Sequence, residues 1–264
     1  MTRWYCTLDA IKDELGDTGT ANDARLRRYI ASASRAIEDM TGRTFVPVTD
    51  TKRFDAPDND WLFLSYEDLS SLIALEDGTG AIPVEYCRLY PLNMTPKHTV
   101  MVDAGAFGRG FEYDDPLGAI AVTGRWGYCE DVTPTGLVLS ADVANTTATA
   151  IVLSGAGCEV GWTLLVDTEA MFVLAVSGNV ATVERGANGT TAATHTTGAV
   201  VSRYVVPADI EQACLEMAIA TNNTRTSGGI RQESIGEYSV SYGASAAIPP
   251  TAQATLRRYR RASV

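Results

Sequence analysis

The stretch that decides the fold is ANDARLRRYIASASRAIEDMTG, residues 21–42. Its apolar side chains recur in steps of three and four, which is typical of one buried face of an α-helix. Asn22 or Asp23 is a suitable N-cap, and Gly42 is the expected C-terminal stop. The sequence therefore predicts a long amphipathic helix whose apolar face other elements must cover. That face consists of Leu26, Tyr29, Ile30, Ala33, Ile37 and Met40.

Both ends of the chain are predicted to be helical. Thr7 is a plausible N-cap for a short helix over residues 8–15, and Pro207 suits the first turn of a helix over 208–224. A short basic helix is expected over residues 251–261. The two longer helices are expected to share a core, and its members are Leu26, Ile30, Ala33, Ile37, Met40, Ile210, Cys214 and Met217.

The middle of the chain shows strand patterns. Residues 44–205 contain short runs rich in Val, Thr and Gly, separated by turn-forming clusters, which is typical of antiparallel sheets. Ser177, Gly178 and Asn179 read as a hairpin turn. We therefore predict an α+β protein, with a helical body of about four helices from residues 1–50 and 204–264. Two β-rich insertions are expected, at 51–135 and 136–203, the second a small barrel or sandwich.

Composition excludes several function classes. The formal net charge is −11, which disfavours a protein that grips nucleic acid but suits a surface past which DNA slides. No apolar run approaches the roughly 18 residues of a membrane span, and the N-terminus lacks a signal-peptide core. The five cysteines form no C-x-x-C pair, so reduced thiols are expected. We expect synthesis in a cytoplasm and no membrane partner.

Catalytic and metal-binding patterns are not found in the sequence. His98 and His195 have no second ligand at metal spacing, so each is expected to be a satisfied or exposed side chain. The glycine run at residues 104–110 has no following helix to hold a phosphate, which favours a turn. The aspartates between residues 55 and 60 lack the remaining ligands of a calcium loop and indicate a solvated turn. We predict no enzyme activity and no cofactor.

Two segments near the C-terminus are candidate contact sites. Residues 256–261 form a basic run, for which three interpretations stay open: complementing the helix dipole, docking on an acidic partner, or contacting nucleic acid. The net charge places nucleic acid last. Residues 233–242 alternate, and they form either an internal strand or a strip that pairs with a neighbouring molecule. The named residues are Leu256, Arg257, Arg258, Tyr259, Arg260 and Arg261 for docking, and Tyr238, Val240 and Tyr242 for pairing.

The two ends together resemble a known family. Residues 7–47, with the step Thr41-Gly42-Arg43-Thr44-Phe45, are similar to the opening of the head-to-tail connector, or adaptor, proteins of long-tailed bacteriophages. The order of elements over 208–261, ending in LRRYRR, is similar as well. Residues 161–201 resemble a small β module inserted in various phage virion proteins, with an E-R-G-x-x-G-T-x-x-x-x-H run from Glu184 to His195.

The resemblance implies a structural protein of the virion neck at the head–tail interface. Family members form a ring, usually of twelve identical subunits, under the portal protein. The ring extends the DNA channel, which DNA traverses without specific binding, and it receives a stopper or tail-completion protein. The family's C-terminal segment inserts at the portal, which implies that role for residues 256–261. A helical body this small buries limited apolar area, so ring neighbours are expected to complete it.

A second hypothesis is a virion-surface module that recognises carbohydrate or a host molecule through the β insertions. Exposed Trp61, Trp126 or Trp162 would form its platform. A hydrolase or nuclease is the third hypothesis, and the missing catalytic residues disfavour it.

Overall fold

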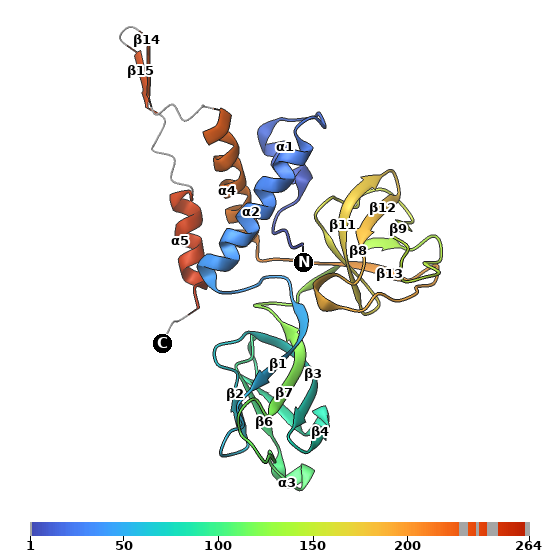
Figure 1. Ribbon diagram of the computed structural model, residues 1–264. Coiled ribbons are helices and arrows are strands. Elements are labelled where there is room, and N and C mark those ends of the chain that lie inside the picture. Colours follow the sequence, from blue (N-terminus) through green and yellow to red (C-terminus); the bar gives the residue numbers. More distant parts are fainter. Residues whose placement is uncertain (1, 227–231, 236–237, 242–247, 262–264) are drawn as a thin grey trace.

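The computed structural model describes residues 2–226, 232–235, 238–241 and 248–261. Figure 1 shows helices at the top, one β-rich part below them and a second β-rich part at one side. We call these parts the helical body, the sandwich unit and the barrel. The predicted α+β class is confirmed, since helices from both chain ends enclose two β-rich stretches in sequence.

The helical body is built from four helices. They are α1 (Leu8–Leu15), α2 (Asp23–Thr41), α4 (Ala208–Thr226) and α5 (Pro250–Tyr259). The Thr7 side chain accepts a hydrogen bond from the Ala10 N–H at 3.1 Å, as an N-cap should. Gly42 ends α2 in the left-handed conformation, with φ of 68°. The predicted helices at both ends are therefore confirmed, although the Asn22 side chain makes no capping hydrogen bond.

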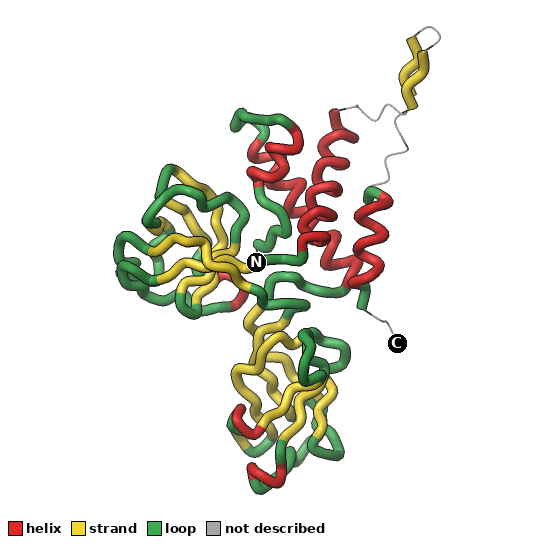
Figure 2. Tube along the Cα trace, turned by 180° about the vertical axis from the view of Figure 1, so that it is seen from behind, coloured by secondary structure: helices red, strands yellow, loops and turns green. Residues whose placement is uncertain are grey.

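Packing within the helical body brings the two chain ends together. Helix α2 packs on α4, α5 packs on both, and α1 contacts α2 and α4, as Figures 1 and 2 show from opposite sides. The expected core residues are buried in one cluster, except that Met40 is half-buried at its edge. The same cluster takes in Phe45 after α2, Leu256 of α5 and Phe172 of the barrel. Within the described residues, none of the helices has the length and apolarity to span a bilayer.

The sandwich unit contains two antiparallel sheets around one core. Its four-stranded sheet has the order β1 (Val48–Phe54), β7 (Ile120–Trp126), β3 (Leu69–Asp77), β4 (Gly80–Ile82). Its three-stranded sheet has the order β2 (Trp61–Phe63), β6 (Thr99–Val102), β5 (Cys87–Tyr90).

Local differences from the expected pattern have simple causes. Residues 84–89, one of the short strand-like runs in the middle of the chain, do not form one strand: a 3₁₀ turn, Val84–Tyr86, follows Pro83 and precedes β5. The glycine run contains a one-turn helix, α3 (Ala104–Phe107), because the Asp103 carboxylate accepts from the Ala106 N–H. It remains a connection between strands.

The barrel is a six-stranded antiparallel sheet that returns on itself. Its order is β8 (Val132–Val138), β13 (Val200–Tyr204), β10 (Thr163–Val166), β11 (Glu169–Ser177), β12 (Val180–Glu184), β9 (Ala150–Val152). A bridge between Leu139 and Leu153, just beyond β8 and β9, closes the ring of strands. The predicted hairpin turn is confirmed, since Ser177 pairs with Val180. Of the two predicted forms, the structure has the barrel.

The alternating segment forms a hairpin of its own. Strand β14 (Gln232–Ile235) pairs antiparallel with β15 (Tyr238–Ser241), and Val240 lies opposite Glu233. Figure 1 shows the two strands beyond the ends of α4 and α5. Tyr242 lies outside the described residues. For Tyr238 and Val240 the structure gives the backbone pairing only.

Candidate functional site: the junction that holds the C-terminal helix

The junction centres on residues 41–45, which begin with the last residue of α2. The Thr41 hydroxyl donates to the Ile37 carbonyl at 2.7 Å, and Gly42 then turns the chain. Phe45 is buried between two tyrosine rings, with centroid distances of 5.6 Å to Tyr5 and 5.3 Å to Tyr259. The step 41–45 therefore connects the N-terminal helices to the last turn of α5.

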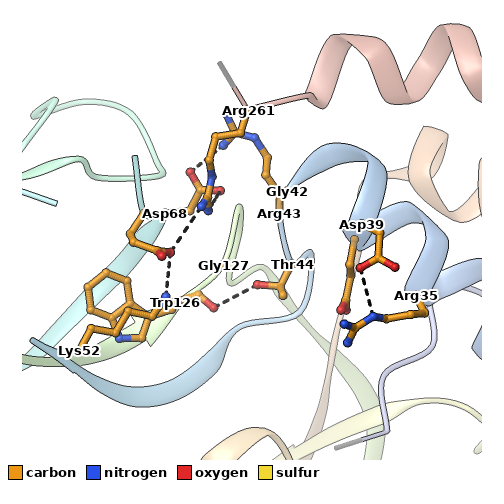
Figure 3. A pocket seen from close by; sticks show the side chains of 12 residues that line it. Arg35, Asp39, Gly42, Arg43, Thr44, Lys52, Asp68, Trp126, Gly127 and Arg261 are labelled. Carbon is orange, nitrogen blue, oxygen red and sulfur yellow. Dashed lines mark hydrogen bonds and ion pairs between the residues drawn. The ribbon is translucent and has the colours of Figure 1, made fainter. Parts of the chain in front are cut away.

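A charged network surrounds this step, as Figure 3 shows. The Arg43 guanidinium donates to Asp68 Oδ1 at 2.6 Å and to the Tyr259 carbonyl at 2.7 Å. Asp68 is 2% exposed, and its second oxygen accepts from Arg261 at 3.2 Å. Because these hydrogen bonds satisfy the buried carboxylate, Asp68 of the sandwich unit joins the residues that follow α2 to those that follow α5.

Tyr259 anchors α5 from the other side. Its hydroxyl donates to Asp209 at 2.8 Å, and Asp209 also accepts from Arg258 at 3.0 Å. Burial and the hydrogen bond to Asp209 raise the pKa of Tyr259 to about 12. The helix is therefore fixed to α4 by polar contacts as well as by Leu256, which is 1% exposed.

The cleft at this junction has a volume of about 270 Å³ and balanced charge. Its lining contains four cationic side chains, Arg35, Arg43, Lys52 and Arg261, and four anionic ones, Glu38, Asp39, Glu67 and Asp68. Most of these groups already pair with each other. The cleft thus presents neither a free nucleophile nor a net charge, and we interpret it as a structural joint.

The six candidate docking residues therefore have different roles. Leu256 and Tyr259 pack inside the helical body, while Arg258 and Arg261 form ion pairs within the chain. Arg257 and Arg260 are exposed. They line a hollow of about 360 Å³ with Asp39, Met40, Gln253 and Leu256.

Sequence reasoning did not single out Asp68 or Glu67, and it noted Arg43 only as part of the family step. Asp68 lies 193 positions from Arg261, so no local pattern could relate them. The signal available in the sequence was the turn Gly42-Arg43-x-Phe45. An arginine next to a buried aromatic residue requires a hydrogen-bonding partner.

The histidine expectations fit the structure. His195 is 3% exposed, and its ring nitrogens lie 2.7 Å from Asp167 Oδ2 and 2.9 Å from Glu169 Oε2. His98 is exposed and contacts the Glu67 carbonyl at 3.3 Å. Across the described ranges, no group of three or more His, Cys, Asp and Glu side chains is placed to hold a metal ion.

The aromatic platform expected for carbohydrate is largely covered. Trp126 is 3% exposed in the sandwich core, and the guanidinium of Arg203 lies 4.5 Å above the half-buried Trp162 ring. Trp61 is 40% exposed and packs on Tyr90 at a ring distance of 4.9 Å. The three tryptophans therefore do not form one surface.

At the junction, the helical body is joined to the sandwich unit through charges that pair within the chain. In a comparison with protein families, residues 5–75 match the family described as phage gp6-like head-tail connector protein. The predicted resemblance to head-tail connector proteins is confirmed for this N-terminal part, which is similar to a family of structural phage proteins.

The match includes α1, α2 and the 41–45 step. The C-terminal helices and the barrel lie outside it, so their resemblances remain predictions. No curated protein sequence matches the chain.

Proposed function

We propose that the protein forms a ring of identical subunits beneath the portal in the virion neck. The ring extends the DNA channel and links the capsid to a stopper or tail-completion protein. The head-tail connector description of residues 5–75 supports this proposal. A head-to-tail interface closes into a ring when the rotation between subunits is suitable, and the net charge of −11 suits a lumen past which DNA slides.

The portal contact is supported by the observation of which residues in 256–261 are already engaged within the chain. Four of its six candidate residues are engaged within the chain, whereas Arg257 and Arg260 are exposed beside an apolar floor of Met40 and Leu256. An arginine pair around an apolar hollow suits an acidic segment with an apolar anchor. We therefore assign the portal contact to Arg257, Arg260 and this hollow.

Truncation after Ile248 is a poor test of this assignment. Ala252 and Leu256 are each 1% exposed within the helical core, so removing α5 would uncover apolar surface as well as remove the docking residues. Point substitutions at exposed positions separate the two effects.

The sharp test is Arg257→Glu/Arg260→Glu, measured by co-sedimentation with purified portal protein. We expect at least a tenfold loss of affinity and an unchanged unfolding transition. A matched control, Arg28→Glu/Arg88→Glu, makes the same charge change at exposed positions of α2 and β5 that line neither the hollow nor the junction cleft. Wild-type affinity in the first variant, or an equal loss in the control, would contradict the assignment.

The hairpin β14–β15 is proposed as a contact with a neighbouring subunit or neck partner through Tyr238, Val240 and Tyr242. An isolated two-stranded hairpin is marginal in water, which favours a further partner. Native mass measurement, alone and with portal, tests the ring. Deleting residues 232–241 should then lower the ring population while leaving the folded subunit intact.

A further inference from the structure

The segment before α1 lies between two parts of the molecule. We call residues 3–7 the N-terminal strap. The Trp4 ring meets Phe172 of the barrel edge-on at 5.4 Å, while the Tyr5 N–H donates to the Ser34 hydroxyl of α2 at 3.0 Å. Trp4 also lies over Gly161, where an added Cβ would approach its ring to 2.7 Å. The strap therefore contacts both the barrel and the helical body.

Two thiols meet beneath this strap. Cys6 of the strap and Cys214 of α4 are 3% and 0% exposed, and their Sγ atoms lie 3.4 Å apart. A disulfide requires about 2.05 Å between sulfurs. Cys214 lies in a helix, whereas Cys6 lies outside any helix or strand, so closing the gap requires a shift of the strap toward α4.

The other cysteines offer no such pair. Cys87 contacts the Pro83 carbonyl, and Cys129 contacts the Phe45 and Val205 carbonyls. Cys158 is buried in the barrel core. Among the described residues, Cys6 and Cys214 therefore form the one pair of sulfurs recorded within contact distance.

We propose that Cys6 and Cys214 are a modification site, at which a disulfide-class oxidant produces an intramolecular disulfide. The thiolate of one cysteine attacks the oxidant and releases one thiol, forming a mixed disulfide. The second cysteine, as its thiolate, attacks this bond and releases the other thiol. Both cysteines lose one proton, the protein loses two electrons, and the oxidant is reduced to two thiols.

The bond would join residues 208 positions apart and fasten the strap to α4. Cross-links that close long loops restrict the unfolded chain most strongly. Thiols stay reduced in a cytoplasm and oxidise outside it. The subunit is therefore reduced when it is made and becomes cross-linked in a particle that leaves the cell, independently of the portal contact.

Peptide mapping of the full chain tests the proposal. Reduced protein is incubated folded with oxidised glutathione, then unfolded in denaturant that contains N-ethylmaleimide so that every remaining thiol is blocked, and digested with trypsin. We expect two of the five thiols to escape blocking and residues 4–12 to appear linked to residues 204–225. Reduction should restore all five thiols, and the oxidised protein should unfold at a higher temperature.

Matched substitutions locate the bond. Cys6→Ser and Cys214→Ser should each abolish the linked peptide, whereas Cys158→Ser, also at a buried thiol, should retain it. Mapping of the wild-type protein decides the matter even where a variant folds poorly. Five blockable thiols after oxidation of the folded protein, a bond to another cysteine, or a bond between two chains would overturn the proposal.

Discussion

The barrel and the helical body reach a packed core in different ways. The barrel takes its core from one continuous stretch, with members from Leu139 to Val201. The helical body combines Leu26 and Ile37 near the start of the chain with Cys214 and Leu256 near its end. A core collected from distant segments depends on each segment staying docked, whereas a continuous unit folds around its own turns.

The buried carboxylates of the two regions also differ in where their partners come from. In the barrel, Glu169 is fully buried and accepts hydrogen bonds from Arg185, from the Gly186 and Ala193 N–H groups and from His195. All five residues belong to the barrel. At the junction, Asp68 binds arginines from two other parts of the chain. The barrel therefore uses its buried carboxylate to fix one loop, and the helical body uses Asp68 to hold separate segments together.

The largest expected effect comes from Glu169→Ala. The change leaves Arg185, whose side chain is 5% exposed, as an unpaired buried charge. Removing one partner of such a pair costs about 3–5 kcal/mol. Hydrogen exchange should show lost protection in the barrel and in the 185–195 loop, while α2 and α4 keep theirs. Equal loss in the helical body would contradict the independence of the barrel.

The two regions should also respond to opposite pH extremes. Burial alone would raise the pKa of Glu169, but the ion pair with Arg185 and the hydrogen bonds from Ala193, His195 and Gly186 lower it to about 2. The folded-state pKa lies below the ordinary value of 4.5. Stability from this group is therefore complete above about pH 4.5 and is lost as the pH falls toward 2.

Tyr259 behaves in the opposite sense, because its folded-state pKa of about 12 lies above the ordinary value of 10.0. Its contribution is complete below pH 10 and is lost as the pH rises through 12. Unfolding curves followed by hydrogen exchange should show the barrel weakening in acid and α5 weakening in alkali. Glu169→Gln should flatten the first dependence and Tyr259→Phe the second; the same pH profile in both variants would refute the division.

Leu256→Ala tests whether α5 is part of the core or an attached helix. Leu256 is 1% exposed against the helical core, and a buried Leu→Ala change costs about 3 kcal/mol. We expect α5 to lose protection from exchange first, with the barrel unchanged. Leu164→Ala, at a fully buried position of the barrel, is the matched control and should affect the barrel alone.

Elements that are bounded by local capping and stop residues could be predicted from the sequence. Thr7 and Gly16 bound α1, and Gly42 ends α2. The compact apolar runs Thr99–Val102 and Thr163–Val166 form strands β6 and β10, because such runs mark strands buried in a sheet. Caps, stops and periodicity all act over a few residues, so a local pattern contains them.

Strands β1 and β8 could not be predicted in the same way. Strand β1 is an edge strand that pairs with β7 alone, and β8 pairs along its length with β13, since its other side meets the β9 end of the barrel only around the bridge at Leu139. Residues 48–54 contain Asp50, Lys52 and Arg53, and residues 132–138 contain Pro134 and Gly136. Edge strands carry charged residues and proline without penalty, so their own sequence resembles a polar loop. Pairing with a distant strand decides their structure.

The candidate docking residues show the same limit of local sequence patterns. The basic run of 256–261 is visible in the sequence, but which of its arginines are engaged depends on Asp209, Glu67 and Asp68. These partners lie 49 or more positions away from the arginines that they bind. Only the fold separates Arg257 and Arg260 from the rest.

The smallest expected effects compare the buried and the exposed ion pairs of the junction cleft. Asp68→Asn keeps the side-chain shape but removes the charge shared by Arg43 and Arg261, and we expect a loss of about 2 kcal/mol. Arg35→Ala breaks an ion pair in the same cleft whose side chains are 71% and 63% exposed, so it should cost less than about 0.5 kcal/mol. Denaturant unfolding measures both. If the two losses were equal, burial of Asp68 would not matter, and α5 would be held by Leu256 and by the contacts of Arg258 and Tyr259 with Asp209. A larger loss in Asp68→Asn, together with earlier exchange in both α5 and β3, means that one carboxylate couples the helical body to the sandwich unit.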